Sequence, residues 1–200
     1  MLRINSLTLT LSGRQILTDI SAEINPGDCC IISGKNGSGK SCLVRALLGV
    51  EKSSHGEVLL DGRNVALLSN AEHRQYFNST GIVSQELLPN SNNSVAHVLM
   101  SHRPGPEQLE KTVNFLHLKG DRQVASLSAS EKRQLDLGRS LVNDPKLIVW
   151  DEPFTFLDYA AKQKWLHHLR DKKISGLTII IATEKPQDCT LLEPEIKIQL

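Results

Sequence analysis

No stretch of this sequence approaches the length of apolar chain that crosses a bilayer. A membrane span needs about 20 consecutive apolar residues, whereas the hydrophobic 40% of this 200-residue chain is spread in short pieces. The first residues, 1–5, have neither the charged head nor the apolar stretch of a signal peptide. We therefore expect a chain that is not exported by that route, has no membrane span, and meets a membrane only through another subunit.

Cysteine is scarce and charge of either sign is balanced. The four cysteines, Cys29, Cys30, Cys42 and Cys189, have no CxxC spacing, which argues against a disulfide or zinc framework and favours buried thiols in a reducing compartment. Lysine and arginine number 23 against 22 acidic residues, for a formal net charge of +1. Such a chain has no field to gather nucleic acid, so we expect no nucleic-acid partner.

Strand and helix patterns alternate along a chain whose length suits one domain. The expected strands are 2–11, 16–24, 29–33, 56–60, 80–83, 147–150 and 178–182, and the expected helices are 41–48, 94–100, 107–116, 130–143 and 159–170. This order predicts an α/β fold with a parallel-rich core, residues 1–85 and 144–200, and an antiparallel edge sheet near the N-terminus. A helical subdomain, residues 86–143, interrupts the core.

The segment 34–41 reads GKNGSGKS and fits G-x-x-x-x-G-K-[ST] between an expected strand and an expected helix. Its glycines let backbone N–H groups surround a phosphate, Lys40 would neutralise β and γ oxygens, and Ser41 would bind magnesium. The predicted nucleotide-binding residues here are Gly34, Asn36, Gly37, Ser38, Gly39, Lys40, Ser41 and Cys42. The segment therefore predicts binding of ATP with Mg²⁺.

A second motif, LIVWDEP at residues 147–153, is an apolar strand that ends in two carboxylates. Asp151 would hold magnesium through water, and Glu152 would polarise the attacking water. An acidic pair at a strand end is by itself more often a solvated turn. The phosphate loop upstream favours the catalytic interpretation.

Between these motifs, the segments LSASE at 127–131, Arg133-Gln134 and GRSL at 138–141 resemble the ATP-binding cassette family. The resemblance covers essentially the whole chain. It implies a P-loop NTPase fold with a RecA-like core, an antiparallel β edge and an inserted helical subdomain. It also implies that Ser128 reaches the γ-phosphate held by the opposite subunit, so that two chains enclose two ATP molecules. Ser130 is also a plausible cap for the helix that follows.

The same resemblance assigns further positions. Gln85 falls where the family has a glutamine that touches magnesium and senses the transmembrane partner, and Leu11 falls where an aromatic ring usually stacks on adenine. Asp158, after Leu157, falls in the dimer-contacting loop, although an aspartate before a helix can also be an N-cap. The metal ligands implied in this way are Ser41, Gln85 and Asp151, and the catalytic residues are Lys40, Gln85 and Glu152.

Three departures from the family pattern predict slow or conditional hydrolysis and weak base discrimination. Glu184 stands where the family usually has a histidine that contacts the γ-phosphate, and loss of one such donor costs about a hundredfold in rate. Residues 129–131 replace Gly-Gly-Gln by Ala-Ser-Glu, which adds bulk where backbone must approach phosphate. Residues 9–13 contain no aromatic side chain.

Within the family, Ala129 and the stretch DEPFT at 151–155 look like the cytochrome c maturation ATPase, which powers haem export. This resemblance implies a peripheral subunit on the cytoplasmic side of the inner membrane. Its partners would be integral membrane transporter subunits and a second nucleotide-binding subunit, in a homo- or heterodimer. Two alternatives stay open: a degenerate nucleotide-binding structural or regulatory subunit with little hydrolysis, and the ATPase of another small ABC exporter. A soluble cassette of translation or DNA repair is disfavoured, because such proteins carry a second cassette, a coiled coil or a basic arm.

Overall fold

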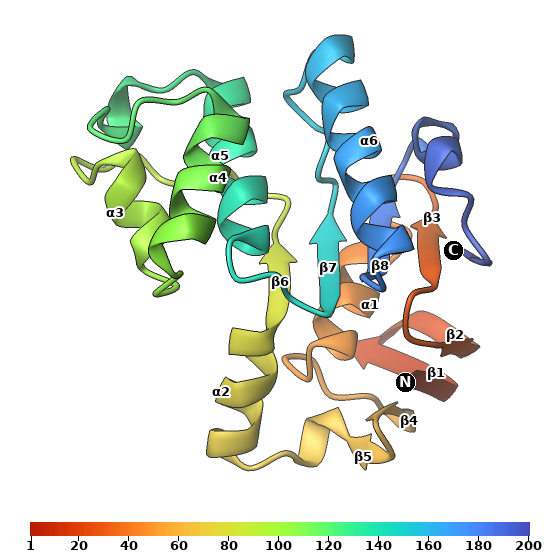
Figure 1. Ribbon diagram of the computed structural model, residues 1–200. Helices are drawn as coiled ribbons and strands as arrows, with labels where there is room; N and C mark the ends of the chain where they lie inside the picture. Colours follow the sequence, from red (N-terminus) through yellow and green to blue (C-terminus); the bar gives the residue numbers. More distant parts are fainter.

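A five-stranded parallel sheet forms the centre of the molecule. The computed structural model describes all residues, 1–200, and orders the strands β6-β7-β8-β3-β9 (Figure 1). Their bounds are Thr80–Val83 (β6), Leu147–Asp151 (β7), Thr178–Thr183 (β8), Cys29–Ser33 (β3) and Ile196–Gln199 (β9). Every pairing in this sheet is parallel. The carboxyl ends of all five strands therefore meet at one edge.

The apolar runs of the central strands explain why this sheet is buried on both faces. All residues of β8 are buried. On β3, Cys29 and Ile31 join the hydrophobic core on one face, while Cys30 and Ile32 join a second core on the other. A strand covered on both faces needs a continuous apolar run and not an alternating one. Burial also raises the pKa of the Cys29 and Cys30 thiols to about 12, so both remain protonated.

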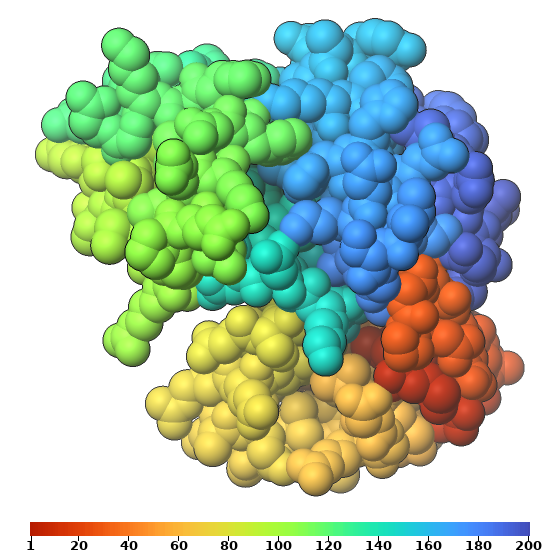
Figure 2. All heavy atoms as spheres, in the orientation of Figure 1, coloured from red at the N-terminus to blue at the C-terminus, as the bar shows by residue number.

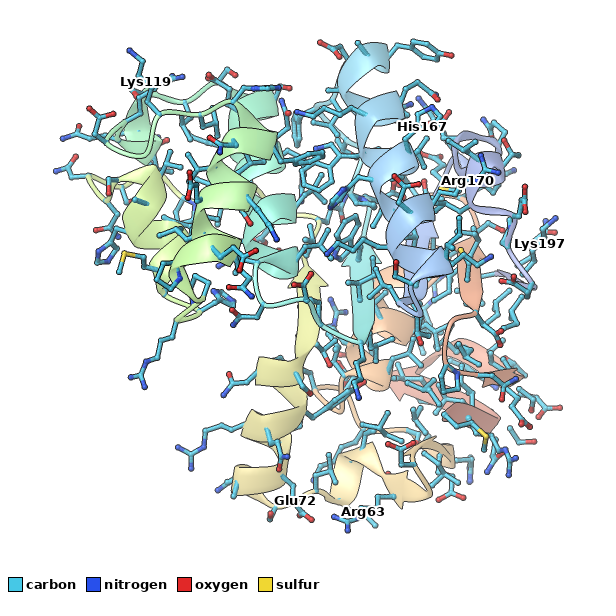
Figure 3. All side chains as sticks on the ribbon, viewed as in Figure 1. Arg63, Glu72, Lys119, His167, Arg170 and Lys197 are labelled. Atoms are coloured by element: carbon cyan, nitrogen blue, oxygen red, sulfur yellow. The ribbon has the colours of Figure 1, made fainter.

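A smaller antiparallel sheet comes from the N-terminal third of the chain. Its strand order is β2-β1-β4-β5, with bounds Arg14–Ile24 (β2), Leu2–Leu11 (β1), His55–Leu60 (β4) and Arg63–Asn64 (β5). The inward side chains of β1, among them Ile4 and Leu9, are buried in the second core. Near the end of this sheet, Arg63 and Glu72 lie together in a 2.9 Å ion pair (Figure 3).

Helices complete both cores. The α-helices are Lys40–Leu47 (α1), Asn70–Ser79 (α2), Val95–Met100 (α3), Pro106–Leu116 (α4), Ala129–Leu141 (α5) and Tyr159–Ile174 (α6). The 3₁₀ segments are Val65–Leu67 (η1), Val124–Ser126 (η2) and Pro186–Leu192 (η3). Helices α3, α4 and α5 form a group beside β6, whereas α6 lies in front of β7 and β8 (Figure 1). None of the helices is both long enough and apolar enough to span a membrane.

The α/β fold predicted from the sequence is confirmed, with differences in individual elements. The sequence patterns did not indicate α2 and β9, and α6 extends to Ile174 instead of ending at residue 170. The division into a core of residues 1–85 and 144–200 and a helical subdomain of residues 86–143 stays a prediction. Leu135 of α5 and Ile148 of β7 share one hydrophobic core, so the helical group and the sheet are packed together.

The cap of α5 corrects one expectation. Ser128, and not Ser130, is the N-cap, because the Ser128 hydroxyl accepts a hydrogen bond from the Glu131 amide. The Glu131 carboxylate accepts one in return from the Ser128 amide at 2.8 Å. This reciprocal capping box satisfies two of the free N–H groups at the start of a helix.

Candidate functional site

The loop between β3 and α1 has a shape that only glycine permits at two positions. A Cβ at Gly34 would lie 2.4 Å from Ser38 Oγ, so the loop could not close on itself with a larger residue there. Gly39 has a φ of 104° and packs so closely on β2 that a Cβ would lie 2.8 Å from Leu17 Cδ2. The amino end of α1 follows directly, and a helix N-terminus after such a loop is suited to bind a phosphate.

Lys40 is the buried cation of this loop, with only 6% of its surface exposed. Its Nζ donates hydrogen bonds to the Gly34 carbonyl at 2.9 Å and the Lys35 carbonyl at 3.2 Å. The same nitrogen lies 3.5 Å from Glu152 Oε1. The ammonium group is thus held at the mouth of the loop, where phosphate oxygens can replace its carbonyl partners.

The carboxylates after β7 lie beside Lys40 because β3 and β7 end at the same edge of the parallel sheet. Asp151, the last residue of β7, is 5% exposed, and its Oδ1 is buried without a hydrogen-bond partner. Such an orphaned acceptor, at the end of the sheet from which the phosphate loop also leaves, suits a hard cation that prefers oxygen ligands, as Mg²⁺ does. The described residues therefore fit a magnesium site.

Glu152 is fixed by the loop that follows β8. The Glu184 amide donates to Glu152 Oε1 at 2.8 Å, and the Thr183 hydroxyl lies 3.4 Å from Glu152 Oε2. The Glu152 amide itself donates to the Ala182 carbonyl at 2.8 Å, with Glu152 in a left-handed conformation at a φ of 46°. These contacts hold the carboxylate toward Lys40 instead of letting it turn into solvent.

The structure also brings Glu184 to the phosphate loop. Asn36 Nδ2 donates to Glu184 Oε2 at 3.1 Å, which joins the loop after β8 to the loop after β3. A cavity of about 540 Å³ opens here, lined in part by Gly34, Lys35, Ser38 and Glu184. The predicted departure from the family histidine therefore falls inside the candidate site, and Thr183 and the Asn36 contact are additions that sequence patterns did not indicate.

Other predicted nucleotide-binding residues surround the same loop. Ser41 and Cys42 lie in the first turn of α1, and Arg45 Nη2 lies 3.3 Å from the Cys42 sulfur. Leu11 ends β1 opposite Arg14 of β2, and two residues further along β2 the Ile16 side chain packs against Gly39. The strand that pairs with Leu11 therefore packs on the phosphate loop, and the contact of Leu11 itself with a base stays a prediction.

Ser128 and Gln85 occupy different places relative to this loop. Gln85 follows β6, which pairs with β7, so it lies at the sheet edge that also carries Asp151. Ser128 is the N-cap of α5 in the helical group beside β6, and none of its hydrogen bonds joins it to residues 34–42 (Figure 1). Within a single chain, the structure does not bring Ser128 to the phosphate site.

A second cavity, of about 490 Å³, lies at the opposite edge of the sheet. Thr80, Leu147 and Thr178, which begin β6, β7 and β8, line part of it. It opens between α2 and the end of α5, where Figure 2 shows the surface hollowed between yellow and green segments. Since phosphate loops occupy the carboxyl edge of such sheets, this cavity is separate from the candidate site.

Arg133 of α5 is the most buried charged residue of the chain, and sequence patterns named it only as part of the family resemblance, without a role. Its side chain is fully buried and donates to the carbonyls of Ser84 and Gln85. The available signal was a pair of opposite charges, Arg133 and Asp136, spaced i and i+3 in a helix whose buried residues include three leucines. Arg133 connects the helix that begins at Ser128 with the segment that carries Gln85.

These features define a P-loop nucleotide-binding protein. They are a glycine-rich loop around a buried lysine, a carboxylate suited to bind Mg²⁺, and a second carboxylate beside the lysine. Comparisons with known proteins give the family. The sequence profile described as ABC transporter matches residues 17–155. Because this is more than half of the chain, the protein belongs to the ABC transporter family and is an ABC-type P-loop ATPase domain that binds ATP.

Individual relatives are similar over most of this chain. The Nod factor export ATP-binding protein I of Neorhizobium galegae is 33% identical over 193 residues, which cover 90% of this chain and 54% of that protein. The spermidine/putrescine import ATP-binding protein of Vibrio parahaemolyticus is 24% identical over 205 residues, 98% of this chain and 54% of that protein. The chain thus spans about half the length of these curated relatives.

Solved structures show the same fold. A dimeric ATP-binding cassette in a post-hydrolysis state, bound to ADP and Pi, is 21% identical with a TM-score of 0.85 and covers 100% of this chain and 94% of that one. A nucleotide-free ATP-binding cassette from an ABC transporter is 25% identical with a TM-score of 0.81, covering 100% and 87%.

Proposed function

We propose that this chain hydrolyses ATP as one half of a cassette dimer and thereby drives the membrane subunits of an ABC transporter. The observation that carries the proposal is the 3.5 Å approach of Lys40 Nζ to Glu152 Oε1 at the mouth of the phosphate loop. A phosphate-binding cation and a carboxylate able to orient water are the two groups that phosphoryl transfer to water requires from the protein.

Each residue has a defined task in this proposal. The loop amides and Lys40 bind the β- and γ-phosphates of ATP, after Lys40 leaves the carbonyls of Gly34 and Lys35. When Mg²⁺ is bound, through Ser41, Gln85 and Asp151, it supplies charge neutralisation of the phosphates. Glu152, held by the Glu184 amide, orients the attacking water and accepts its proton.

Steady-state hydrolysis of ATP in the presence of Mg²⁺ tests the proposal with the purified protein and two variants. Glu152→Gln keeps the shape of the side chain but removes its basicity, and Lys40→Ala removes the phosphate cation. We expect turnover in the unaltered protein, loss of at least about a hundredfold in each variant, and retained ATP binding in Glu152→Gln only. If the unaltered protein hydrolyses ATP no faster than the Glu152→Gln variant, the result would instead support a nucleotide-binding structural or regulatory subunit.

The partners belong to the same proposal. The chain acts as a peripheral subunit on the cytoplasmic side of an inner membrane, bound to integral transporter subunits near Gln85 and residues 87–89. The finer assignment to haem export in cytochrome c biogenesis is supported only by Ala129 and the 151–158 stretch. Affinity purification from detergent-solubilised membranes tests it: co-purified haem-handling membrane proteins support haem export, and an unrelated permease as the sole membrane partner contradicts it.

A further inference from the structure

We propose that Arg133 is a positioning residue that holds Gln85 at the magnesium side of the site and joins it to the helix bearing Ser128. The inference rests on the proposed function, because it assigns Gln85 a contact with Mg²⁺. It concerns one side chain and two backbone carbonyls. Arg133 itself touches neither nucleotide nor metal in this proposal.

The guanidinium of Arg133 binds the Gln85 segment at two points. Its Nη1 donates to the Ser84 carbonyl at 2.7 Å and its Nη2 to the Gln85 carbonyl at 2.6 Å. The side chain is 0% exposed, so water does not compete for these bonds. Charged donors in a buried setting form the stronger class of hydrogen bond. Residues 84–85 are therefore tied to α5 by a contact that is costly to break.

The position of the tie connects it to the metal side of the site. Val83, the last residue of β6, pairs with Trp150, and Asp151 follows Trp150 directly. Residues 84–85 thus leave the sheet beside Asp151. Because Arg133 engages the backbone of Gln85, the Gln85 side chain, which makes no hydrogen bond to the protein, is left available at that edge.

Carboxylates near Arg133 balance its buried positive charge. Asp136 lies 3.6 Å from Arg133 and 2.5 Å from Arg139, so one buried carboxylate is shared by two guanidinium groups. Burial lowers the pKa of Arg133, and Asp136 and Asp151 oppose that change. The positive charge of Arg133 is thus balanced on one side by its own helix and on the other by the carboxylate proposed to hold magnesium.

Two consequences follow for the site. Partner groups behind a metal ligand orient it, and their loss commonly costs about tenfold to a hundredfold in metal affinity. Arg133 also lies on the helix that Ser128 caps, so a movement of Gln85 is transmitted to the residue proposed to cover the nucleotide of a second chain.

Calorimetric titration with ATP, once with Mg²⁺ and once with EDTA, tests the positioning role without any turnover. The variant is Arg133→Met, and the matched control is Arg139→Met, which removes the other guanidinium from Asp136 but no contact to residues 84–85. In Arg133→Met we expect the affinity gained from Mg²⁺ to fall at least about tenfold, with unchanged affinity in EDTA. In Arg139→Met we expect the full gain.

A second variant separates positioning from folding. Arg133→Met combined with Asp136→Leu removes both buried charges at once, an exchange that folded proteins often tolerate well. It should show the same loss of the magnesium-dependent gain, together with faster hydrogen exchange of the amides of residues 86–88. An unchanged gain in this folded double variant, or an equal loss in Arg139→Met, would overturn the role of Arg133. If the unaltered protein does not hydrolyse ATP, the proposed function is contradicted but the role of Arg133 is not, since this titration does not depend on hydrolysis.

Discussion

Glu184 is the residue at which two parts of the site meet. Its amide fixes Glu152, and its carboxylate accepts a hydrogen bond from Asn36 of the phosphate loop. Any residue except proline supplies the amide N–H, but only an acidic one places a negative charge beside the phosphates. The backbone of residue 184 therefore holds the carboxylate proposed to be catalytic, whereas its side chain opposes the binding of a further anion.

Replacing Glu184 by histidine should raise the turnover of ATP. The Glu184→His variant keeps the amide that holds Glu152, removes the negative charge and adds a donor toward the γ-phosphate. We expect kcat to rise about tenfold to a hundredfold, the amount that one donor to transition-state charge contributes. A phosphate-release assay at saturating ATP with Mg²⁺ measures it.

The control is Glu184→Gln, which removes the charge without adding a ring nitrogen. If kcat rises in Glu184→His but not in Glu184→Gln, the added donor causes the effect. If kcat rises equally in both variants, loss of the negative charge causes it. A decrease in both variants would contradict the account, because it would mean that the carboxylate itself assists the reaction.

Two helices, α2 and α5, begin with the same kind of capping box. We expect one box to affect stability alone and the other to affect both stability and function. Ser69 with Glu72 starts α2, and Ser128 with Glu131 starts α5, with the same reciprocal hydrogen bonds. The first box contains no candidate site residue. The second replaces the family's glycines and glutamine, so the altered 128–131 segment is a well-capped helix start.

Removing either cap should cost similar stability but have different effects on function. Ser69→Ala and Ser128→Ala should each lower the free energy of unfolding by about 1 kcal/mol, the usual value of a serine N-cap. Only Ser128→Ala should also lower ATP hydrolysis, because only Ser128 is proposed to reach a nucleotide. Urea unfolding and hydrolysis, measured on both variants, check this. Equal activity in the two would show that Ser128 acts as a cap and nothing more.

The ion pair behind the second cap gives a pH dependence. The Arg122 guanidinium, followed by the Ser128 amide, lowers the pKa of Glu131, so the folded state favours the ionised form. Its contribution is present above the unfolded pKa of about 4.3 and is lost as pH falls through the lower folded pKa. Arg122→Gln should therefore be less stable than the unaltered protein by about 0.5–1 kcal/mol at pH 7, and this difference should vanish in strong acid.

Urea unfolding at pH 7 and in strong acid, below the folded pKa of Glu131, measures the difference. Lys111→Gln is the control, since its partner Glu107 is exposed and belongs to no cap. A difference for Arg122→Gln that persists unchanged in acid would mean that packing of the arginine, and not its charge, stabilises α5.

For the whole molecule, local patterns predicted most strands because the central ones are continuous apolar runs and the phosphate loop marks the first of them. They did not indicate α2, whose only strong signal is the Ser69 capping box, or β9, whose four residues alternate as an edge strand. Within the site, Lys40 and Glu152 could be predicted because their motifs are local. The contacts of Asn36 with Glu184 and of Arg133 with Gln85 span 148 and 48 residues, and no local pattern encodes them.

The placement of Ser128 predicts how the molecule assembles. Ser128 caps a helix outside the phosphate site of its own chain, so a nucleotide contact requires the Ser128 of another chain. Phe156 and Tyr159 are 51% and 76% exposed on either side of Leu157 and Asp158, which supplies apolar surface for such a contact.

We expect the Glu152→Gln variant, with ATP and Mg²⁺, to have twice the monomer mass by light scattering, because blocked hydrolysis keeps the nucleotide in place. Adding Ser128→Arg should return it to a monomer, whereas adding Ser69→Arg at the other cap should not. A monomer in Glu152→Gln at saturating ATP would exclude a homodimer built through this surface and would leave a different cassette chain as the partner.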